Sequence, residues 1–349
     1  MTRRAVSRCP LQSTDPVGTQ PLLAVRDLRV RFRTAEGFVQ AAAGVSYDLF
    51  GGEVLGIVGE SGSGKTVSAM AILGLLPATA EVTGEIVFRG QDLLDLPTEE
   101  LREVRGRRIA MVFQDALAAL NPLHRVGSQI AEAITTHQHD VGRREIRDRT
   151  VQLLADVGIP NPASAARRYP HEFSGGMRQR AVIAMAMAND PEVIIADEPT
   201  TALDVTTQAQ VLEVLERMRQ RTGSAMVLIT HNLGVVTGVA DRVLVMYAGK
   251  VVESGAIGQV FGQPAHPYTL GLIGSMPHLE QEGGRLRRIA GHPPSLIHVP
   301  RGCAFHPRCP YAQVPAPCAT EVPALRTATG PGHQSACHLT GALPPQPTG

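Results

Sequence analysis

The sequence predicts an α/β fold with a mostly parallel sheet, and two observations lead to this prediction. Three compact apolar segments, at 53–58, 193–198 and 224–230, have the composition of strands that are buried on both faces. A glycine-rich segment, GESGSGKT, joins the first of them to an apolar stretch that indicates a buried helix. Strands that alternate with helices in this way are typical of a parallel sheet covered by helices.

Length, composition and charge narrow the class of protein. The chain has 349 residues, enough for one large domain or two smaller ones, and its 43% hydrophobic and 19% charged residues are ordinary for a globular protein. With 33 basic and 32 acidic residues the net charge is +1, so we expect no nucleic-acid partner. No apolar run is long enough to span a membrane, which favours a cytoplasmic protein.

Shorter patterns indicate the remaining elements. Residues 1–20 lack the apolar core of a signal peptide and are expected to form a disordered leader. The segment 22–32 alternates like a half-buried strand, 38–50 indicates several short strand-like pieces, and 242–255 indicates a hairpin. Beyond about residue 260, Pro, His, Gly and Cys become dense and periodicity fades. We therefore expect a separate C-terminal extension, 261–340, followed by a disordered tail at 341–349.

The segment GESGSGKT fits the phosphate-loop pattern G-x-x-x-x-G-K-S/T, and its place between a strand and a helix supports a P-loop NTPase (RecA-like) core. Its backbone N–H groups would surround phosphate oxygens of ATP. The lysine would bridge the β- and γ-phosphates, and the threonine would ligate Mg²⁺. The residues expected to bind the nucleotide are Gly59, Ser61, Gly62, Ser63, Gly64, Lys65 and Thr66.

The segment VIIADE supplies a partner for this loop. Four apolar residues place Asp197 at the carboxyl end of a buried strand, where α/β sheets bind their ligands. Asp197 is expected to hold Mg²⁺ through a water, and Glu198 to polarise the attacking water as general base. A lone Asp-Glu pair is more often a solvated loop, but here it accompanies a phosphate loop and a third buried strand.

The segment FSGGMRQR predicts a second anion site. Ser174, Gly175 and Gly176 precede a helix, so a hydroxyl, backbone amides and the helix dipole come together. One chain seldom needs two cradles for one nucleotide, so we expect this one to grip the γ-phosphate of an ATP held by another chain. The alternative, a helix N-cap with a glycine turn, is the default for such a segment alone.

With these motifs in place, the sequence resembles the nucleotide-binding subunits of ATP-binding cassette (ABC) transporters. Six motifs occur in the family's order over about 22–260: GESGSGKT, VFQD, FSGGMRQR, VIIADEPT, TALD and LITHN. The resemblance implies an ABC ATPase domain at 21–260. Within it, the family has an N-terminal antiparallel β subdomain and a helical subdomain, here at about 115–190, which docks the transmembrane partner.

The resemblance also implies roles for single residues. Gln114 would sense Mg²⁺ or the attacking water and couple to the permease, and His231 would contact the γ-phosphate and position the water. Asp204 would communicate across a dimer whose opposing site Ser174 and Gly176 complete. Taken alone, each residue has a structural alternative. Gln114 could be a surface loop residue, His231 a hydrogen-bonded histidine after a strand, and Asp204 a helix N-cap.

An aromatic residue at the end of the first strand usually stacks on adenine in this family. Phe32 fits that position and Phe38 is the runner-up, while simple packing is the alternative. Two positions depart from the family pattern. Phe173 replaces the usual leucine before the signature serine, and QDALAALNP lacks the proline often found after the glutamine loop; neither change removes a chemical group.

A finer resemblance involves the segments GQPAHPYTLGLIGSMP and GHPPSLIHVPRGCAFHPRCPYA, which look like the C-terminal region of oligopeptide/dipeptide and nickel importer ATPases. It implies a subunit that energises peptide import at the cytoplasmic face of the cell membrane. The partners would be a second ATPase subunit in a heterodimer, two permease subunits and an extracytoplasmic solute-binding protein. An importer of nickel or another small solute, an exporter, and a soluble ABC ATPase acting on DNA or ribosomes are the alternatives.

The extension carries four cysteines separated by 5, 8 and 18 residues, while Cys9 lies in the leader. This spacing is a weak metal signal, so free buried thiols, a Cys₄ zinc site and a [4Fe–4S] cluster all remain open. The resemblance favours the cluster, outside the catalytic cassette. The four cysteines are Cys303, Cys309, Cys318 and Cys337, and the histidines that could replace one of them are His306, His333 and His338.

Overall fold

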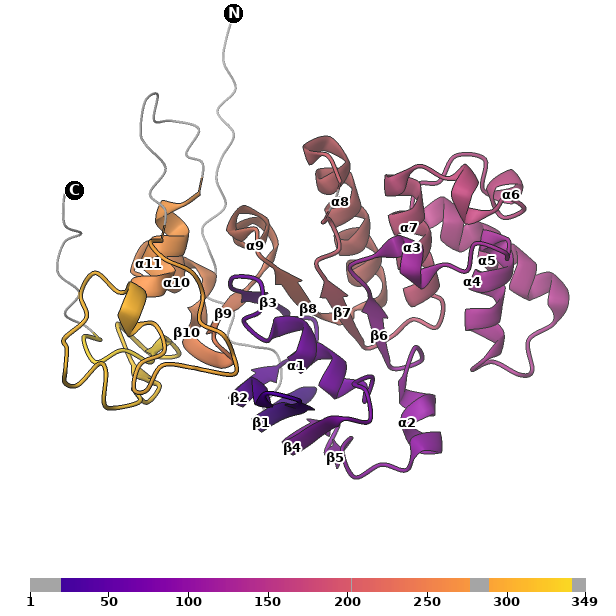
Figure 1. The fold of residues 1–349 in the computed structure, drawn as a ribbon. Helices are drawn as coiled ribbons and strands as arrows, with labels where there is room; N and C mark the ends of the chain where they lie inside the picture. Colours follow the sequence, from indigo (N-terminus) through magenta and orange to yellow (C-terminus); the bar gives the residue numbers. More distant parts are fainter. Residues whose placement is uncertain (1–19, 202, 277–288, 341–349) are drawn as a thin grey trace, which may run out of the picture.

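The computed structural model describes residues 20–201, 203–276 and 289–340. Two sheets form the centre of the molecule, and helices cover them (Figure 1). The leader and the tail predicted from the sequence fall on 1–19 and 341–349, which lie outside the described residues.

The smaller sheet is antiparallel and has the strand order β2-β1-β4-β5. Its strands are β1 (Leu23–Thr34), β2 (Gly37–Leu49), β4 (Ala80–Phe88) and β5 (Gln91–Asp92). The expectation of several short pieces at 38–50 was wrong, because β2 is one strand of 13 residues. It stays continuous because it pairs with β1 along its length, and irregular steps in the register absorb its broken hydrophobic pattern.

The larger sheet has eight strands in the order β11-β12-β10-β9-β3-β8-β7-β6. The five strands from β9 to β6 run parallel, whereas β10, β12 and β11 are antiparallel additions at one edge. The three strands predicted from their apolar composition are confirmed as β3, β7 and β8. The bounds are β3 (Val54–Val58), β6 (Ile109–Val112), β7 (Val193–Asp197), β8 (Ala225–Thr230), β9 (Arg242–Tyr247), β10 (Lys250–Ala256), β11 (Arg326–Thr327) and β12 (Gln334–Ser335).

The helices fall into three groups in space (Figure 1). Those that accompany the sheets are α1 (Lys65–Ile72), α2 (Thr98–Val104), α8 (Val205–Thr222) and α9 (Leu233–Val239). A helical region at one end contains α3 (Ala116–Ala119), α4 (Val126–Thr135), α5 (Arg143–Asp156), α6 (Pro162–Ala165), the 3₁₀ turn η1 (Pro170–Glu172) and α7 (Gly175–Ala186). The opposite end contains α10 (Ile257–Gly262), α11 (Pro267–Gly274) and the 3₁₀ turn η2 (His306–Arg308).

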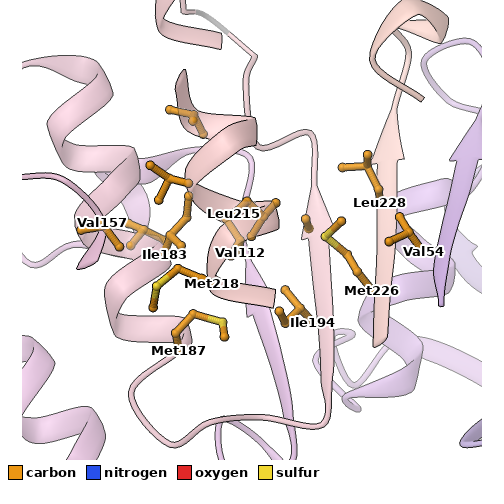
Figure 2. Close-up of a cluster of buried hydrophobic side chains, with 14 of the residues drawn as sticks. Val54, Val112, Val157, Ile183, Met187, Ile194, Leu215, Met218, Met226 and Leu228 are labelled. Carbon is orange, nitrogen blue, oxygen red and sulfur yellow. The ribbon is translucent and has the colours of Figure 1, made fainter. Parts of the chain in front are cut away.

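The core has two halves because successive side chains of a strand point to opposite faces of the sheet. On β3, Val54 and Val58 belong to one hydrophobic cluster while Leu55 and Ile57 belong to the other. Figure 2 shows the first cluster, in which side chains of β3, β7 and β8 pack against those of α7 and α8. Burial on both faces explains why these strands are apolar without alternation, and it fixes the positions of their carboxyl ends.

The sequence led us to expect a C-terminal extension that is separate from the preceding domain. In the structure, a strand of this extension instead joins the larger sheet. Strand β12 pairs with β10, with Glu253 opposite Ser335. The carboxylate of Glu253 has no exposed surface; it accepts hydrogen bonds from the backbone N–H groups of Ala265 at 2.7 Å and His266 at 2.9 Å. It also pairs with Nε2 of the fully buried His333 at 2.8 Å. A buried polar network therefore anchors the extension.

Candidate nucleotide site

The phosphate loop lies between β3 and α1, as predicted, and its shape requires glycine. Gly59, Gly62 and Gly64 all have positive φ angles. A Cβ atom at Gly64 would lie 2.1 Å from the carbonyl oxygen of Ala41, so even alanine would collide with the backbone of β2. The strand and the helix thus hold a tight loop whose N–H groups precede a helix N-terminus, which suits phosphate oxygens.

Lys65 is buried beside this loop. Its Nζ donates hydrogen bonds to the carbonyl oxygens of Gly59 at 2.8 Å and Glu60 at 3.0 Å. Burial lowers the pKa of its ammonium group, and the carboxylates of Glu198, Asp197 and Glu60 oppose that effect. The charge of Lys65 is therefore desolvated and close to the loop, where an anionic ligand would be attracted strongly.

Thr66 and Asp197 meet at the carboxyl ends of β3 and β7. The hydroxyl of Thr66 donates to Oδ1 of Asp197 at 3.1 Å. Burial raises the pKa of the Asp197 carboxyl, although the hydrogen bond from Thr66 acts against it. Two oxygen donors of this kind, one of them a carboxylate, suit a hard cation such as Mg²⁺, so the residues present fit the predicted ion.

Glu198 is the point at which three polar side chains converge. Its Oε2 accepts hydrogen bonds from Nε2 of Gln114 at 3.1 Å and from the hydroxyl of Thr201 at 2.8 Å. Nδ1 of His231 lies 3.2 Å from the same oxygen. Gln114, Glu198 and His231 were predicted from motifs far apart in the chain, and the structure brings all three together; Thr201 was not predicted.

The local environment keeps Glu198 ionised. Burial acts to raise the pKa of its carboxyl, but the hydrogen bonds from Thr201 and His231, together with the nearby charge of Lys65, outweigh burial and leave the pKa below its ordinary value. Its backbone has a φ of 44°, a left-handed conformation that is unusual outside glycine. Such conformations persist where the surrounding structure enforces them.

The second predicted anion site lies apart from the phosphate loop. Ser174 caps α7, where its Oγ accepts from the N–H of Met177 at 3.3 Å, and Gly175 and Gly176 form the first turn. Within the described residues no hydrogen bond or ion pair joins these three residues to the loop at 59–66. In this chain the contacts of Ser174 are those of an N-cap of α7.

Asp204 lies next to this cradle. It caps α8 and accepts hydrogen bonds from the N–H of Thr207 at 3.0 Å and its hydroxyl at 2.6 Å, which lower the pKa of its carboxyl. A Cβ atom at Gly176 would lie 2.5 Å from Cγ2 of Thr207, so glycine lets the starts of α7 and α8 approach closely. Within this chain, Ser174 and Asp204 therefore act as helix N-caps, which was the structural alternative for each residue.

The two aromatic candidates for an adenine platform differ in exposure. Phe32 is half-buried and packs against the hydrophobic cluster around the smaller sheet. Phe38 is 49% exposed, and the guanidinium carbon of Arg31 lies 4.8 Å above its ring. Both residues belong to the β1–β2 hairpin, and the contact of this hairpin with adenine stays a prediction.

The four cysteines of the extension lie in one neighbourhood. Burial raises the pKa of Cys309 to about 12 and that of Cys337 to about 11, and the other thiols act in the same direction. Yet no group of three or more His, Cys, Asp or Glu side chains in the described ranges is placed to hold a metal ion. The predicted metal site therefore finds no support in these contacts.

The three histidines considered as replacement ligands already have partners. His333 pairs with Glu253, Nδ1 of His306 lies 2.9 Å from the carbonyl oxygen of Cys303, and Nε2 of His338 lies 3.0 Å from that of Glu321. These contacts favour structural roles for all three.

Sequence reasoning missed a further residue of the loop, Glu60. Its carboxylate forms a two-point ion pair with Arg308 of the extension, and its N–H donates to the hydroxyl of Tyr268. Tyr268 lies in the His-Pro-Tyr-Thr stretch, which was noted only as part of a family pattern. The available signal was the acidic side chain itself, because a carboxylate in a loop that binds phosphate is stabilised by a nearby cation.

Comparison with known proteins identifies two families within the chain. Residues 42–201 match the ABC transporter family, and residues 252–315 match the C-terminal region of oligopeptide/dipeptide transporters. The dipeptide transport ATP-binding protein DppD of Bacillus subtilis is 50% identical over 297 residues, which cover 84% of this chain and 88% of that protein. The oligopeptide transport ATP-binding protein OppD of Salmonella typhimurium is 46% identical, with 88% and 91% covered.

The OppD protein of Mycobacterium tuberculosis is 51% identical over 92% of this chain, but the chain spans only about half (52%) of that relative's length. Among solved structures, the dimeric ATP-binding cassette MJ0796, bound to ADP and Pi after hydrolysis, has a TM-score of 0.61 and 27% identity. It covers 67% of this chain, and 98% of that cassette is matched. None of the described helices combines the length and apolar composition needed to cross a membrane.

Proposed function

Since this chain belongs to the ABC transporter family of ATP-binding proteins, we propose that it is the ATPase subunit of an importer of oligopeptides or dipeptides. The observation that carries the ATPase part is the convergence of Gln114, Thr201 and His231 on Glu198, beside the phosphate loop. The match of 252–315 to the oligopeptide/dipeptide transporter region supports peptides as the solute.

In this proposal each residue of the site acts on ATP or on the attacking water. The N–H groups of the loop and Lys65 bind and orient the β- and γ-phosphates. Thr66 and Asp197 would hold Mg²⁺, which when bound neutralises phosphate charge. Glu198, kept ionised by its hydrogen bonds, accepts a proton from the water, while His231 and Gln114 orient it toward the γ-phosphate. The adenine would stack on Phe32.

A second ATPase subunit would complete the site. Ser174, Gly175 and Gly176 lie at the start of α7 and, among the described residues, share no hydrogen bond or ion pair with the loop at 59–66, which supports a head-to-tail pair in which each chain's cradle closes the other's site. The matched cassette MJ0796 is described as dimeric. Asp204, beside the cradle, would face the partner chain. We propose a different chain as the partner, as the resemblance to peptide importer ATPases implies.

The helical region offers a surface for the permease subunits. The segment at 117–124 and helix α4 line a groove of about 900 Å³, where Leu117 is 59% exposed and Leu123 is 82% exposed. The lining begins at Leu117, three positions after Gln114 in the chain, and the Gln114 side chain contacts Glu198, so a permease segment seated there would act close to that carboxylate. We therefore place the chain at the cytoplasmic face of the membrane, together with two permeases and an extracytoplasmic solute-binding protein.

An uptake assay tests the proposal. Deletion of the gene from its source cells is expected to abolish uptake of a labelled tripeptide and to confer resistance to a toxic one, while a plasmid copy restores both. A copy carrying Lys65→Ala, made in equal amount, is expected to restore neither, because the loop then lacks its phosphate-binding cation. Undiminished peptide uptake together with a loss of nickel uptake would overturn the peptide assignment in favour of nickel.

We further propose that Cys303, Cys309, Cys318 and Cys337 form a site for a [4Fe–4S] cluster, with zinc as the alternative. The proposal rests on the resemblance of this region to importer ATPases and on the closeness of the four thiols, which raise the pKa of Cys309 and Cys337 in addition to burial. Their side chains would have to turn toward one another to bind it. Anaerobic purification is expected to give about four irons per chain; stoichiometric zinc, or no metal, would overturn the cluster.

A further inference from the structure

Glu60 is contacted by side chains from the C-terminal extension although it lies inside the phosphate loop. It follows Gly59 directly, and its three polar groups all have partners. Its N–H donates to Tyr268, its carboxylate pairs with Arg308, and its carbonyl oxygen accepts from Lys65. Two of these partners lie more than 200 positions further along the chain, with sequence separations of 208 and 248 residues.

Arg308 is built into this contact. Its Nη1 and Nη2 donate to the two carboxylate oxygens of Glu60 at 2.6 and 2.9 Å, and its side chain is only 6% exposed. Nε donates to the carbonyl oxygen of Ala290 at 2.9 Å. The guanidinium carbon also lies 5.8 Å from the ring centre of Tyr247 and 5.9 Å from that of Phe305. An arginine held on all these sides presents its planar fork in one orientation.

Tyr268 holds the backbone of the same residue. Its hydroxyl oxygen accepts the Glu60 N–H at 2.8 Å, and its ring is fully buried. The ring centre lies 4.7 Å from that of Tyr247 and 5.4 Å from that of Phe305, so Tyr268 shares the aromatic cluster that surrounds Arg308. The two contacts to Glu60 thus come from one packed unit of the extension and β9.

These contacts bear on nucleotide binding through the shape of the loop. Because Tyr268 takes up the Glu60 N–H, that donor is turned away from phosphate, and the donors left for ATP are those that follow it. The Glu60 carbonyl also accepts from Lys65, so the position of Glu60 influences where the lysine's ammonium rests. A loop held in advance binds without the cost of ordering it.

We propose that Arg308 and Tyr268 are positioning residues for ATP, which hold the phosphate loop through Glu60 and make ATP affinity depend on the docked extension. They touch no reacting atom. The inference rests on the proposed nucleotide site and adds to it a coupling between the importer-type extension and that site. An extension shifted by whatever binds it would then change ATP affinity directly.

The test measures binding of a fluorescent ATP analogue, mant-ATP with Mg²⁺, to the full chain, and steady-state hydrolysis by the full chain together with its partner ATPase subunit. Arg308→Gln is expected to weaken binding about tenfold and Tyr268→Phe a few-fold, in line with the loss of a charged and a neutral hydrogen bond. KM should rise in parallel while kcat stays within about twofold, because neither residue contacts Glu198 or His231. Arg301→Gln, an exposed change in the same extension, is the matched control and should bind as the parent does.

A double-mutant cycle separates positioning from general stability. If Arg308 acts through Glu60, Arg308→Gln in a Glu60→Gln background weakens binding no further than Glu60→Gln alone. Tyr268→Phe keeps the buried ring, so it reports on the hydrogen bond even if Arg308→Gln melts at a lower temperature. Parent-like affinity in both Arg308→Gln and Tyr268→Phe would overturn the inference, whereas a parent chain that fails to bind mant-ATP would overturn the nucleotide site itself.

Discussion

The catalytic edge of the sheet and the C-terminal extension are built on different physical principles. Asp197 and Glu198 stand at the end of a strand buried on both faces, so the apolar core positions them. In residues 289–340 of the extension, the core contributes much less. Its buried apolar side chains are Phe305, Cys318 and Ala336, and its buried polar side chains are His333 and Ser335.

This difference predicts where each region is vulnerable. At the catalytic edge the backbone is fixed by strands, so a polar side chain can be changed with loss of chemistry and little loss of stability. In the extension the polar side chains themselves hold the fold, because Glu253 and His333 tie it to β10 and Arg308 ties it to the loop. Three experiments test this contrast.

The largest effect is expected from Glu198→Gln. Loss of a general base typically lowers the rate by 10² to 10⁴, so hydrolysis should fall at least about 100-fold while ATP still binds. Phosphate release and mant-ATP binding measure the two properties. Glu192→Gln, at the amino end of the same strand, is the matched control and should hydrolyse ATP at a near-normal rate. Near-normal turnover by Glu198→Gln would contradict the assignment of the base.

Glu253→Gln should instead reduce stability. It removes the charge that two buried N–H groups and His333 share, and breaking a buried pair costs about 3–5 kcal/mol. Urea denaturation should show this loss, and limited proteolysis should cleave the extension first. Glu99→Gln, which breaks an exposed pair with Arg102 on α2, should cost less than about 1 kcal/mol. If the two changes lowered the free energy of unfolding equally, the claim that buried polar contacts hold the extension would be contradicted.

The smallest effect is a shift in pH dependence. Thr201→Val removes one of the hydrogen bonds that hold the pKa of Glu198 below its ordinary value, so that pKa should rise. The carboxylate is the active form and is lost as pH falls, so the acid limb of the kcat profile should move to higher pH. A profile identical to that of Thr237→Val, an exposed control on α9, would show that Thr201 does not tune the base.

The sequence alone was enough to predict the elements that local patterns specify. Apolar composition identified β3, β7 and β8, and motif residues after those strands identified Thr66, Asp197 and Glu198, because parallel strands end at one edge of a sheet. The hydrophobic pattern of the sequence was misleading for β2, because the continuity of this strand depends on pairing with β1. It was also misleading for the extension, where strand β12 depends on pairing with β10.

Only the tertiary structure decided which distant residues meet. The contact of Arg308 with Glu60 spans 248 positions and leaves no periodic trace, since each residue alone resembles an ordinary surface charge. The same holds for His333 and Glu253. Local sequence determines strands, loops and their chemistry through backbone preferences and burial. The contacts between the extension, which buries few apolar side chains in residues 289–340, and the sheet depend on how the whole chain packs. The same packing links the extension to the phosphate loop.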